Sequence, residues 1–252
     1  MRVLGVIPAR FKSSRFPGKP LVKILGVEMI KRTYMQAKNA KTLDKLVVAT
    51  DDKRIFDFCK QENLEVVITS ESHLTGTDRI AEVAHKINAD FYVNIQGDEP
   101  IIDPRSIDEI VNFALDSHTK GKKYEVFNLY KNISPKEAQR DSIVKVVVNE
   151  NDELVFMSRF PIPFSKSHEN PNHKKQVAVY VFSAYALKLF EQSFKTHGKG
   201  INERFEDIEI LRFIDMGEKV KMLECFYDSI SVDEPCDVNL VEKWLTLKKN
   251  KP

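Results

Sequence analysis

Near the start of the chain an apolar run leads directly into a basic loop, in the stretch Val3-Leu4-Gly5-Val6-Ile7-Pro8-Ala9-Arg10-Phe11-Lys12-Ser13-Ser14-Arg15-Phe16-Pro17-Gly18-Lys19-Pro20-Leu21. Val3–Ile7 predicts a short buried strand, because such continuous apolar runs are typical of parallel strands. The loop after it gathers cations and small residues within a short distance, namely Arg10, Lys12, Arg15 and Lys19 with Ser13, Ser14 and Gly18.

This loop is a candidate phosphate site. Ligands of α/β proteins gather above the carboxyl ends of the parallel strands. A triphosphate needs cationic side chains and backbone N–H donors there. The loop follows neither the Walker A pattern nor the G-x-G-x-x-G fingerprint, which disfavours a nicotinamide dehydrogenase. On charge alone a solvated basic loop stays an alternative, but the prolines favour a shaped loop.

Strand and helix patterns alternate through the first half of the chain. β-rich runs occur at Leu46–Ala49, Val66–Ile68 and Phe91–Ile95. Helical spacing occurs from Met29 to Ala37, after Asp51 or Asp52 as a cap, and at Ile80, Val83, Ala84 and Ile87. This alternation predicts an α/β fold, a mixed and mainly parallel sheet wrapped by helices.

The second half is less regular. Strands are expected at Val126–Tyr130, Ile143–Val148, Leu154–Met157 and Val177–Phe182, a polar loop at Ser165–Lys175, and helices at Phe205–Ile214 and Cys236–Leu247. We therefore expect a single domain over residues 1–252, with a smaller antiparallel subdomain within about residues 125–200 that forms a flap or a dimer arm.

Composition limits the classes of function. The chain has 252 residues, of which 42% are hydrophobic, and a net charge of +2 from 39 basic and 37 acidic residues. No basic excess supports binding to nucleic acid by charge alone. The three cysteines, Cys59, Cys225 and Cys236, show no metal or disulfide spacing, which favours a reducing compartment. No run is apolar enough for a signal peptide or a membrane span, so we expect a cytoplasmic protein.

Two acidic residues lie just beyond predicted strands. Asp98 follows Phe91–Ile95 and Gly97, and Asp233 follows Ile230–Val232, which we interpret as another strand. Folding could bring both carboxylates to one point, and Mg²⁺ is usually bound by one or two carboxylates plus phosphate oxygens. As alternatives, Asp98 could cap the helix that begins at Pro104, and Asp233 could start the last helix. Glu99 and Asp237 are expected to serve local structure.

Five segments, in order, resemble one family, the 3-deoxy-D-manno-octulosonate (Kdo) cytidylyltransferases. They are the basic loop, Thr75-Gly76-Thr77-Asp78-Arg79, Asn94-Ile95-Gln96-Gly97-Asp98-Glu99-Pro100, Ser158-Arg159 with Ile162-Pro163, and Ser231-Val232-Asp233-Glu234-Pro235-Cys236-Asp237. The resemblance covers nearly the whole chain. It implies the Rossmann-like fold of nucleotide-diphospho-sugar transferases and a homodimer. It also implies a nucleotide-sugar synthesis that serves a surface polysaccharide such as lipopolysaccharide or capsule.

The resemblance also implies the reaction and its residues. A sugar hydroxyl attacks the α-phosphorus of CTP and pyrophosphate leaves, without a protein nucleophile. Asp98 and Asp233 are the implied Mg²⁺ ligands and, with Lys19, the catalytic residues. The implied nucleotide-binding residues are Arg10, Ser13, Arg15, Lys19, Thr77, Arg79 and Gln96. The implied residues for an acidic sugar acceptor are Gln96, Arg159, Gln176, Tyr180 and Glu209, with Arg159 gripping the carboxylate because a guanidinium matches it bidentately.

Two departures affect the acceptor residues. The family's His-Leu-Gly-Ile-Tyr segment appears here as Gln176-Val177-Ala178-Val179-Tyr180, and its Leu-Glu-Gln-Leu-Arg segment as Ile208-Glu209-Ile210-Leu211-Arg212. Two polar groups expected near the sugar are thus replaced, which predicts a modified Kdo-like acid as the preferred acceptor. The alternative is neutral change, in which Gln176 makes the histidine's hydrogen bond and Ile210 only packs.

Two other functions stay open on the sequence. A cytidylyltransferase for a non-sugar acid, such as a phosphonate or a polyol phosphate, would share the CTP loop and would explain Ile210. A non-catalytic nucleotide-binding module would share the fold, but the retention of both Asp98 and Asp233 speaks against it. Release of pyrophosphate with a suitable acceptor separates these cases.

Overall fold

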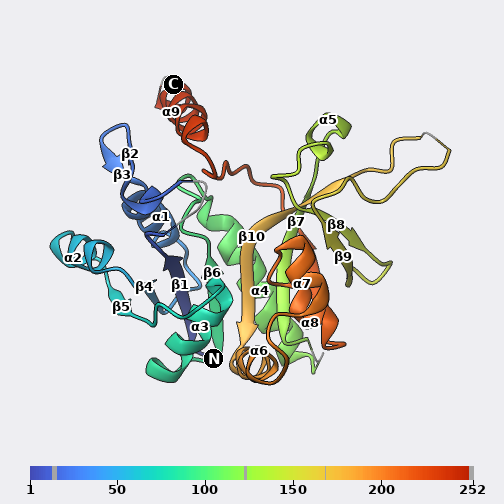
Figure 1. Cartoon of the computed structure of the whole chain (residues 1–252), viewed down its shortest axis with the longest axis horizontal. Coiled ribbons are helices and arrows are strands. Elements are labelled where there is room, and N and C mark those ends of the chain that lie inside the picture. Colours follow the sequence, from blue (N-terminus) through green and yellow to red (C-terminus); the bar gives the residue numbers. More distant parts are fainter. Residues whose placement is uncertain (13–15, 122–123, 168, 250–252) are drawn as a thin grey trace. The chain divides into compact units, whose positions relative to one another are not determined.

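The chain divides into two compact units. The computed structural model describes residues 1–12, 16–121, 124–167 and 169–249. Unit 1 consists of Met1–Glu109 and Tyr227–Pro252, and unit 2 of Ile110–Phe226 (Figure 1). Unit 2 includes the range 125–200 in which a subdomain was expected, and extends beyond it on both sides; its role in dimerisation stays a prediction.

Unit 1 is built on a parallel sheet with the strand order β6-β1-β4-β5. The strands are β6 (Phe91–Ile95), β1 (Val3–Ala9), β4 (Lys45–Thr50) and β5 (Val66–Ile68), which confirms the predicted runs. β1 is central and almost wholly buried, with Val6 in register with Val47 and Asn94. Because the strands are parallel, their carboxyl ends share one edge of the sheet, the edge from which the candidate site is built.

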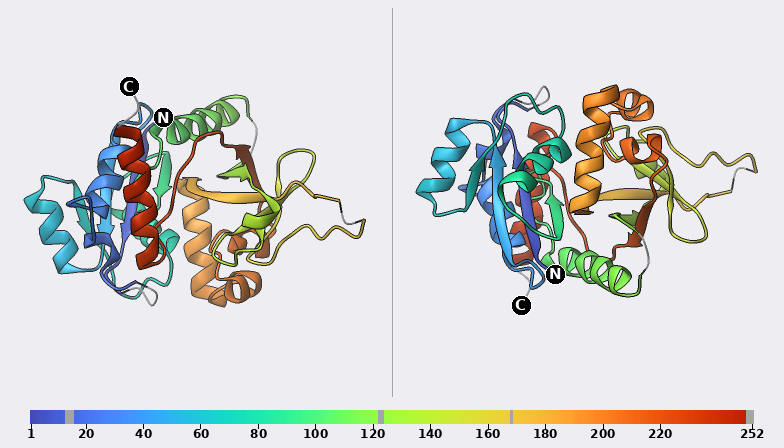
Figure 2. Two further views of the ribbon diagram at one scale, coloured as in Figure 1. Left: turned by 90° about the horizontal axis from the view of Figure 1, so that it is seen from above. Right: turned by 90° about the horizontal axis from the view of Figure 1, so that it is seen from below.

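Helices follow the strands of unit 1, as the alternation predicted (Figures 1 and 2). They are α1 (Met29–Ala37), α2 (Lys53–Gln61), α3 (Gly76–Lys86), α4 (Pro104–Thr119), which continues into unit 2, and α9 (Pro235–Lys249). Asp52 caps α2, accepting from the Arg54 N–H at 2.9 Å. Thr75 and Asp78 cap each other's backbone at the start of α3, a reciprocal capping box.

A second apolar cluster holds the C-terminal part of unit 1 in place. A short 3-10 turn, η1 (Lys19–Leu21), precedes the hairpin of β2 (Lys23–Ile24) and β3 (Val27–Glu28). Residues 227–234, called the strap below, lead into α9. Val232 of the strap is fully buried with Ile24, Met29, Ile101 and Val241. Burying such side chains contributes roughly 1.5–3 kcal/mol each, so the strap is anchored beside the basic loop's end.

Unit 2 contains a mixed sheet. β7 (Val126–Asn132) pairs in parallel with β11 (Val220–Glu224) and antiparallel with β10 (Lys174–Ser183). β8 (Lys145–Val148) pairs antiparallel with β10 and with β9 (Leu154–Ser158). The helices are α5 (Pro135–Ala138), α6 (Ala184–His197), α7 (Ile201–Glu206) and α8 (Leu211–Asp215). The fold class is therefore confirmed as α/β with a mixed, mainly parallel pattern in unit 1 and antiparallel pairs in unit 2.

Several predicted boundaries are wrong. Phe205–Ile214 is not one helix, because Asp207 takes a left-handed conformation (φ 52°) between α7 and α8. Ile230–Val232 forms no strand and belongs to the extended strap. The polar loop ends at residue 173, since β10 already begins at Lys174. α6 and β11 had not been predicted. Within the described ranges, no helix has the length and apolar character that crossing a membrane requires.

Candidate functional site

Close backbone packing places Asp98 at the carboxyl edge of the unit 1 sheet. A Cβ on Gly97 would lie 2.9 Å from the carbonyl oxygen of Pro8 in β1, so the approach of these two backbones requires glycine. The hydroxyl of Thr33 lies 3.1 Å from the Gly97 carbonyl oxygen and fixes it from α1. Asp98 is therefore held by two elements, and it does not cap α4, whose first turn is capped by Asp103.

The Lys19 ammonium group joins both predicted carboxylates. Its Nζ lies 2.6 Å from Asp98 Oδ2 and 3.8 Å from Asp233 Oδ1. It also donates to the Val232 carbonyl at 3.0 Å. The side chains of Lys19, Asp98 and Asp233 are 16%, 22% and 24% exposed, so the group is partly shielded yet open to a ligand. Asp98 and Asp233 lie 79 and 214 positions after Lys19 in the chain, yet both approach its ammonium group. Folding therefore brings the two carboxylates together, as predicted.

The strap delivers Asp233 to this point. Val232 N–H donates to the Asp98 carbonyl at 2.9 Å, and the Val232 side chain is buried. The carboxylate of Asp237 accepts from the N–H groups of Asp233 and Glu234 at 3.0 and 2.9 Å. Asp237 therefore caps α9, the local role expected of it, while the Asp233 carboxylate is directed toward Lys19. Glu99 accepts from the Ser229 hydroxyl and also serves local structure.

The donor set suits Mg²⁺ in combination with a polyphosphate. Among the residues that the structure describes, no group of three or more His, Cys, Asp or Glu side chains converges as a self-sufficient metal site. Mg²⁺ typically takes one or two carboxylates and completes its octahedron with waters and phosphate oxygens. Asp98 and Asp233 provide that number of carboxylates around one cation. The residues present therefore fit a metal that binds together with nucleotide.

The described part of the basic loop is shaped by Phe11. Its carbonyl accepts from Gly18 N–H at 2.9 Å, and its ring packs where a Gly18 side chain would be, at a residue with φ +72°. The Arg54 guanidinium lies 3.2 Å from the ring centroid and is held by Asp52. The ordered loop that the prolines predict is consistent with this hydrogen bond between Gly18 and Phe11. The loop is anchored to the start of α2 through a cation–π contact.

The loop's cations differ in how strongly they are held. Arg10 is exposed, and its nearest partner is the Leu74 carbonyl at 3.4 Å. Lys12 is exposed and lies 3.5 Å from Glu71. Ser13 and Arg15, both predicted to bind nucleotide, lie outside the described residues. Such weakly held surface pairs exchange easily for a ligand phosphate, so Arg10 stays a candidate for phosphate binding.

The Thr77–Arg79 segment is buried rather than open. Thr77 is fully buried and Arg79 is 2% exposed. The Arg79 guanidinium donates to Asp51 at 2.9 Å and to the Thr69 hydroxyl. It therefore ties α3 to the carboxyl ends of β4 and β5 instead of facing solvent. Gln96, at the end of β6, is half-buried. The predicted nucleotide contacts of these three residues stay predictions.

A cluster of hydrogen bonds stabilises the turn before Thr75. Burial alone would raise the pKa of Glu82, but hydrogen bonds from Lys86, Ser70 N–H and His73 outweigh it and lower that pKa to about 2. His73 and Lys86 approach the two oxygens of the Glu82 carboxylate at 2.5 and 2.6 Å. Glu82 thus fixes residues 70–73 against α3, just ahead of the segment that carries Arg79.

In unit 2 the predicted acceptor residues occupy β9, β10 and the α7–α8 connection. The Arg159 guanidinium donates to three backbone carbonyls, of Glu206 at 2.9 Å, Asp207 at 3.3 Å and Asp141 at 3.3 Å. The Gln176 amide donates to Asn128 Oδ1 at 3.2 Å and lies 3.3 Å from Met157 Sδ. A cation bound only to neutral carbonyls keeps its charge available for an anion.

The other acceptor candidates of unit 2 differ in burial. Tyr180 is 5% exposed and stacks on Phe182, and Glu209 is half-buried. Ile210, expected to face the sugar, is fully buried, so it offers no surface to a ligand and acts through packing. The roles of Tyr180 and Glu209 in acceptor binding stay predictions.

Two residues with prominent contacts were absent from the sequence prediction, and a third, Asp51, had been considered only as a helix cap. Lys145 is fully buried, and Glu206 bonds to the Ser158–Arg159 turn. Asp51 is the partner of Arg79. The burial of Lys145 could have been predicted, because it is the charged residue within the apolar run Ile143–Val148. No sequence pattern predicts the contacts of Glu206 and Asp51, because exposed-looking acidic residues near loops are common.

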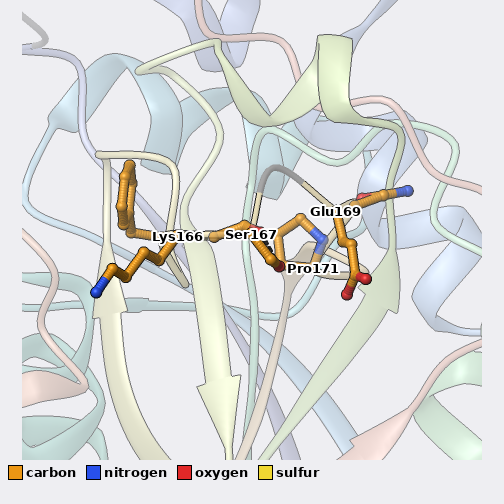
Figure 3. A pocket seen from close by; sticks show the side chains of 7 residues that line it. Lys166, Ser167, Glu169 and Pro171 are labelled. Carbon is orange, nitrogen blue, oxygen red and sulfur yellow. Dashed lines mark hydrogen bonds between the residues drawn. The ribbon is translucent and has the colours of Figure 1, made fainter.

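One hollow lies apart from these clusters. It has a volume of about 670 Å³ and is lined by Phe164, Ser165, Lys166, Ser167, Glu169, Asn170 and Pro171 (Figure 3). All of these residues belong to the single loop before β10, and none is a predicted site residue. A concavity formed by one open loop provides no convergent polar groups of the kind a substrate site needs.

The chain matches known proteins over nearly its whole length. Residues 4–231 match the family model described as Cytidylyltransferase. The 3-deoxy-manno-octulosonate cytidylyltransferase of Solibacter usitatus (strain Ellin6076) is 39% identical over 249 residues, 96% of this chain and 94% of that protein. The Escherichia coli 3-deoxy-manno-octulosonate cytidylyltransferase is 36% identical over 230 residues, 91% of this chain and 90% of that protein.

Solved structures agree with these sequence matches. The structure of CMP:2-keto-3-deoxy-manno-octonic acid synthetase complexed with CTP superposes with a TM-score of 0.89 at 33% identity, covering 98% of this chain and all of that chain. The inositol-1-phosphate CTP transferase from T. maritima has a TM-score of 0.64 at 17% identity, covering 99% and 97% of the two chains, which shows a shared fold alone.

Proposed function

Since the chain belongs to the cytidylyltransferase family, we propose that it transfers CMP from CTP to the anomeric hydroxyl of an acidic 2-keto-3-deoxy sugar and releases pyrophosphate. The acceptor is Kdo or a modified Kdo-like acid, as the names of the relatives and of the CTP-bound structure support. The observation that carries the proposal is the meeting of Asp98, Asp233 and Lys19 beside the basic loop. This arrangement can neutralise a triphosphate and a metal at one point.

The chemistry needs positioning and charge neutralisation rather than a protein nucleophile. The acceptor hydroxyl oxygen forms a bond to the α-phosphorus and gives up its proton to solvent. The bond from that phosphorus to the oxygen bridging to the β-phosphate breaks, and pyrophosphate leaves with the electron pair. Lys19 and Arg10 hold phosphate oxygens as the negative charge shifts toward the leaving group. Arg79, being buried, acts by holding Asp51 and the start of α3 in place.

Asp98 and Asp233 are the residues that would hold Mg²⁺. When bound, the metal would polarise the α-phosphate and neutralise charge on the pyrophosphate. Lys19 contributes a fixed positive charge that lies 2.6 Å from Asp98 and 3.8 Å from Asp233 and holds the two carboxylates near one point. In unit 2, Arg159 binds the acceptor carboxylate with its guanidinium charge, and Gln176 donates to an acceptor oxygen. Gln96 of unit 1 stays a candidate for either substrate.

The test is a pyrophosphate-release assay with CTP, Mg²⁺ and a panel of 2-keto-3-deoxy acids. The expected result is turnover that requires an acid of this class, prefers CTP over ATP, GTP and UTP, and is lost in excess chelator. A phosphonate and a polyol phosphate serve as control acceptors. Turnover with these and none with the sugar acids would show an acceptor of a different class, and absence of pyrophosphate release with every acceptor would indicate a non-catalytic module.

We also propose that the protein is a homodimer paired through unit 2. Its surface there includes the large apolar side chains of Phe160, Phe164 and Phe205, which are 71%, 81% and 78% exposed. Exposed aromatic side chains of this size are typical of protein interfaces. Light scattering at micromolar concentration is expected to give twice the 29.0 kDa mass of the chain, and a monomer would contradict the proposal.

A further inference from the structure

The carboxylate of Glu206 holds the turn that carries Arg159. Glu206 Oε1 accepts from the Ser158 hydroxyl at 2.6 Å, and Oε2 accepts from the Arg159 backbone N–H at 2.9 Å. Ser158 Oγ in turn accepts from Phe160 N–H at 2.9 Å. Ionised acceptors make the stronger class of hydrogen bond. Both oxygens of one carboxylate are therefore used to fix the backbone from Ser158 to Phe160.

The guanidinium of Arg159 is fixed in the same place without being neutralised. Its Nε donates to the backbone carbonyl of Glu206 itself, and its two Nη atoms donate to the carbonyls of Asp207 and Asp141. Within the described ranges, no carboxylate lies within 4 Å of the guanidinium. The connection after α7 thus orients the arginine through peptide dipoles and leaves its charge for an anionic ligand.

Lys145 supports the turn from the buried side. Its side chain is fully buried, and its ammonium donates to the carbonyls of Arg159, Arg140 at 2.8 Å and Ile143 at 2.7 Å. Burial lowers the pKa of Lys145, and the charge of Arg159 acts in the same direction, while the charges of Asp141 and Glu206 oppose them without reversing the shift. A buried ammonium is costly unless its donors are satisfied. All three N–H donors of this ammonium are used on backbone carbonyls, one of which belongs to Arg159.

From this geometry we infer that Glu206 and Lys145 are positioning residues for the acceptor carboxylate, acting through Arg159. The inference rests on the proposed function, since it takes Arg159 as the residue that binds that carboxylate. The Glu206 carboxylate accepts from the Arg159 backbone N–H, and the Glu206 backbone carbonyl accepts from Arg159 Nε. Lys145 donates to the Arg159 carbonyl. Neither side chain contacts substrate; together they determine where the guanidinium points.

Helix α7 does not depend on Glu206 for its place in unit 2. Arg212 of α8 makes a bidentate ion pair with Glu203 of α7, with both N–O distances at 2.7 Å and both side chains fully buried. The Glu203 carboxylate also accepts from Gly200 N–H at 3.0 Å, ahead of the helix. Loss of the Glu206 carboxylate should therefore loosen the Arg159 turn and leave the fold intact.

The experiment compares Glu206→Gln with wild type and with Glu150→Gln, an exposed glutamate in the β8–β9 turn. Initial rates are measured against Kdo, or the best acid of the panel, and separately against CTP. The expected result is an acceptor KM raised roughly 10- to 100-fold by misplacement of the guanidinium, with the CTP KM and the melting temperature near the wild-type values. Glu150→Gln should behave as wild type.

The double variant Arg159→Ala/Glu206→Gln provides the second readout. If Glu206 acts through Arg159, the double variant is no worse than Arg159→Ala alone, because the two losses are coupled. An unchanged acceptor KM in Glu206→Gln, an equal rise in the CTP KM, or additive losses in the double variant would each overturn the inference while the proposed function stands. Absence of turnover by wild type with every acid would instead overturn the proposed function, and this inference with it.

Discussion

Two candidate cations of unit 1, Lys19 and Arg79, are paired with carboxylates, whereas the candidate cation of unit 2, Arg159, is held by backbone carbonyls. Lys19 lies between Asp98 and Asp233, and Arg79 lies against Asp51. In unit 2, Arg159 and Lys145 are bound by backbone carbonyls. Paired charges suit a site that exchanges cations with a metal and a polyphosphate. Carbonyl-bound cations suit a site that receives one small anion. The difference is consistent with the proposal that Lys19, Asp98 and Asp233 act on the nucleotide and that Arg159 binds the acceptor.

The largest effect is expected from removing a carboxylate in unit 1. Asp98→Asn should lower kcat by about 100-fold or more, because a neutral amide is a poor ligand for Mg²⁺ and removes one of two charges that orient Lys19. Asp233→Asn should behave nearly the same. Rates are measured at saturating substrates over a range of Mg²⁺ concentrations, with melting temperature as the check on folding.

Asp57→Asn is the matched control for these two variants, since Asp57 is a half-exposed partner of Lys53 on α2. It should leave kcat unchanged, because exposed pairs of this kind contribute little. Near-native kcat in Asp233→Asn would show that the strap residue is structural, and the metal would then rest on Asp98 alone.

The matching change in unit 2 is Arg159→Ala. Loss of a charge-assisted contact to the acceptor carboxylate costs roughly 2–5 kcal/mol when the partner charge is desolvated. We expect the loss in kcat/KM for the acceptor, with the CTP KM close to wild type. Arg204→Ala, which removes an exposed arginine of α7, is the control. Equal losses toward CTP and acceptor would break the division of labour between the units.

Smaller effects are expected from the cations of unit 1. Lys19→Ala and Arg10→Ala should raise the CTP KM roughly 10- to 100-fold, the range expected for hydrogen bonds to a charged group, and should affect the acceptor KM less. A defect confined to the acceptor KM would place either residue in the acceptor site instead.

Lys19→Met adds a measurement that does not depend on turnover. The Lys19 ammonium bonds to Asp98 at 2.6 Å, so it competes with any other cation for that carboxylate. Removing it leaves two carboxylates facing each other, which favours binding of an opposite charge. In the absence of nucleotide, Mg²⁺ should therefore stabilise Lys19→Met against heat more than wild type. Equal Mg²⁺-dependent shifts in melting temperature would show that the lysine and the metal use different space.

The sequence predicted unit 1 better than unit 2, for physical reasons. In unit 1 the parallel strands are short, mainly apolar runs, so Val66–Ile68 and Phe91–Ile95 were predicted with the bounds that the structure shows. In unit 2, β8 and β9 are only partly buried, and β11 is a run of five residues, Val220–Glu224, that two charged residues interrupt. The left-handed Asp207 that separates α7 from α8 leaves no clear pattern in the sequence.

The site was predictable as a set of residue types, and its contacts were not. Asp98 could be found because a carboxylate that follows Gly97 and a buried strand lies at the ligand-binding edge. The Lys19 contact with the Val232 carbonyl joins residues 213 positions apart. A local sequence pattern does not predict a contact between residues so far apart in the chain. The burial of Arg79 against Asp51 likewise depends on the packing of α3 on the sheet, so the basic side chain that looked free for phosphate is already paired.

The smallest effect is expected for the two departures from the family pattern, and the structure now separates them. Ile210 is fully buried in unit 2, so Ile210→Gln should lower the melting temperature, because an amide placed there is desolvated. It should leave the ratio of acceptors unchanged. Gln176 is half-buried, and its amide reaches Asn128 Oδ1 at 3.2 Å. Any change in acceptor preference is therefore expected from Gln176.

We expect plain Kdo to be a poorer acceptor than a relative altered at the end remote from the carboxylate, by roughly 10-fold in kcat/KM, because a changed polar partner discriminates between hydroxyl and substituted groups. Arg159, proposed to bind the carboxylate end, is retained, so both acids should lose equally in Arg159→Ala. Gln176→His should move the preference back toward plain Kdo. The measurement is kcat/KM for Kdo, for amino-substituted analogues and for nonulosonates, in wild type and in Gln176→His. If plain Kdo is the best acceptor of wild type, Gln176 has replaced the histidine without consequence, because its amide donates the same hydrogen bond.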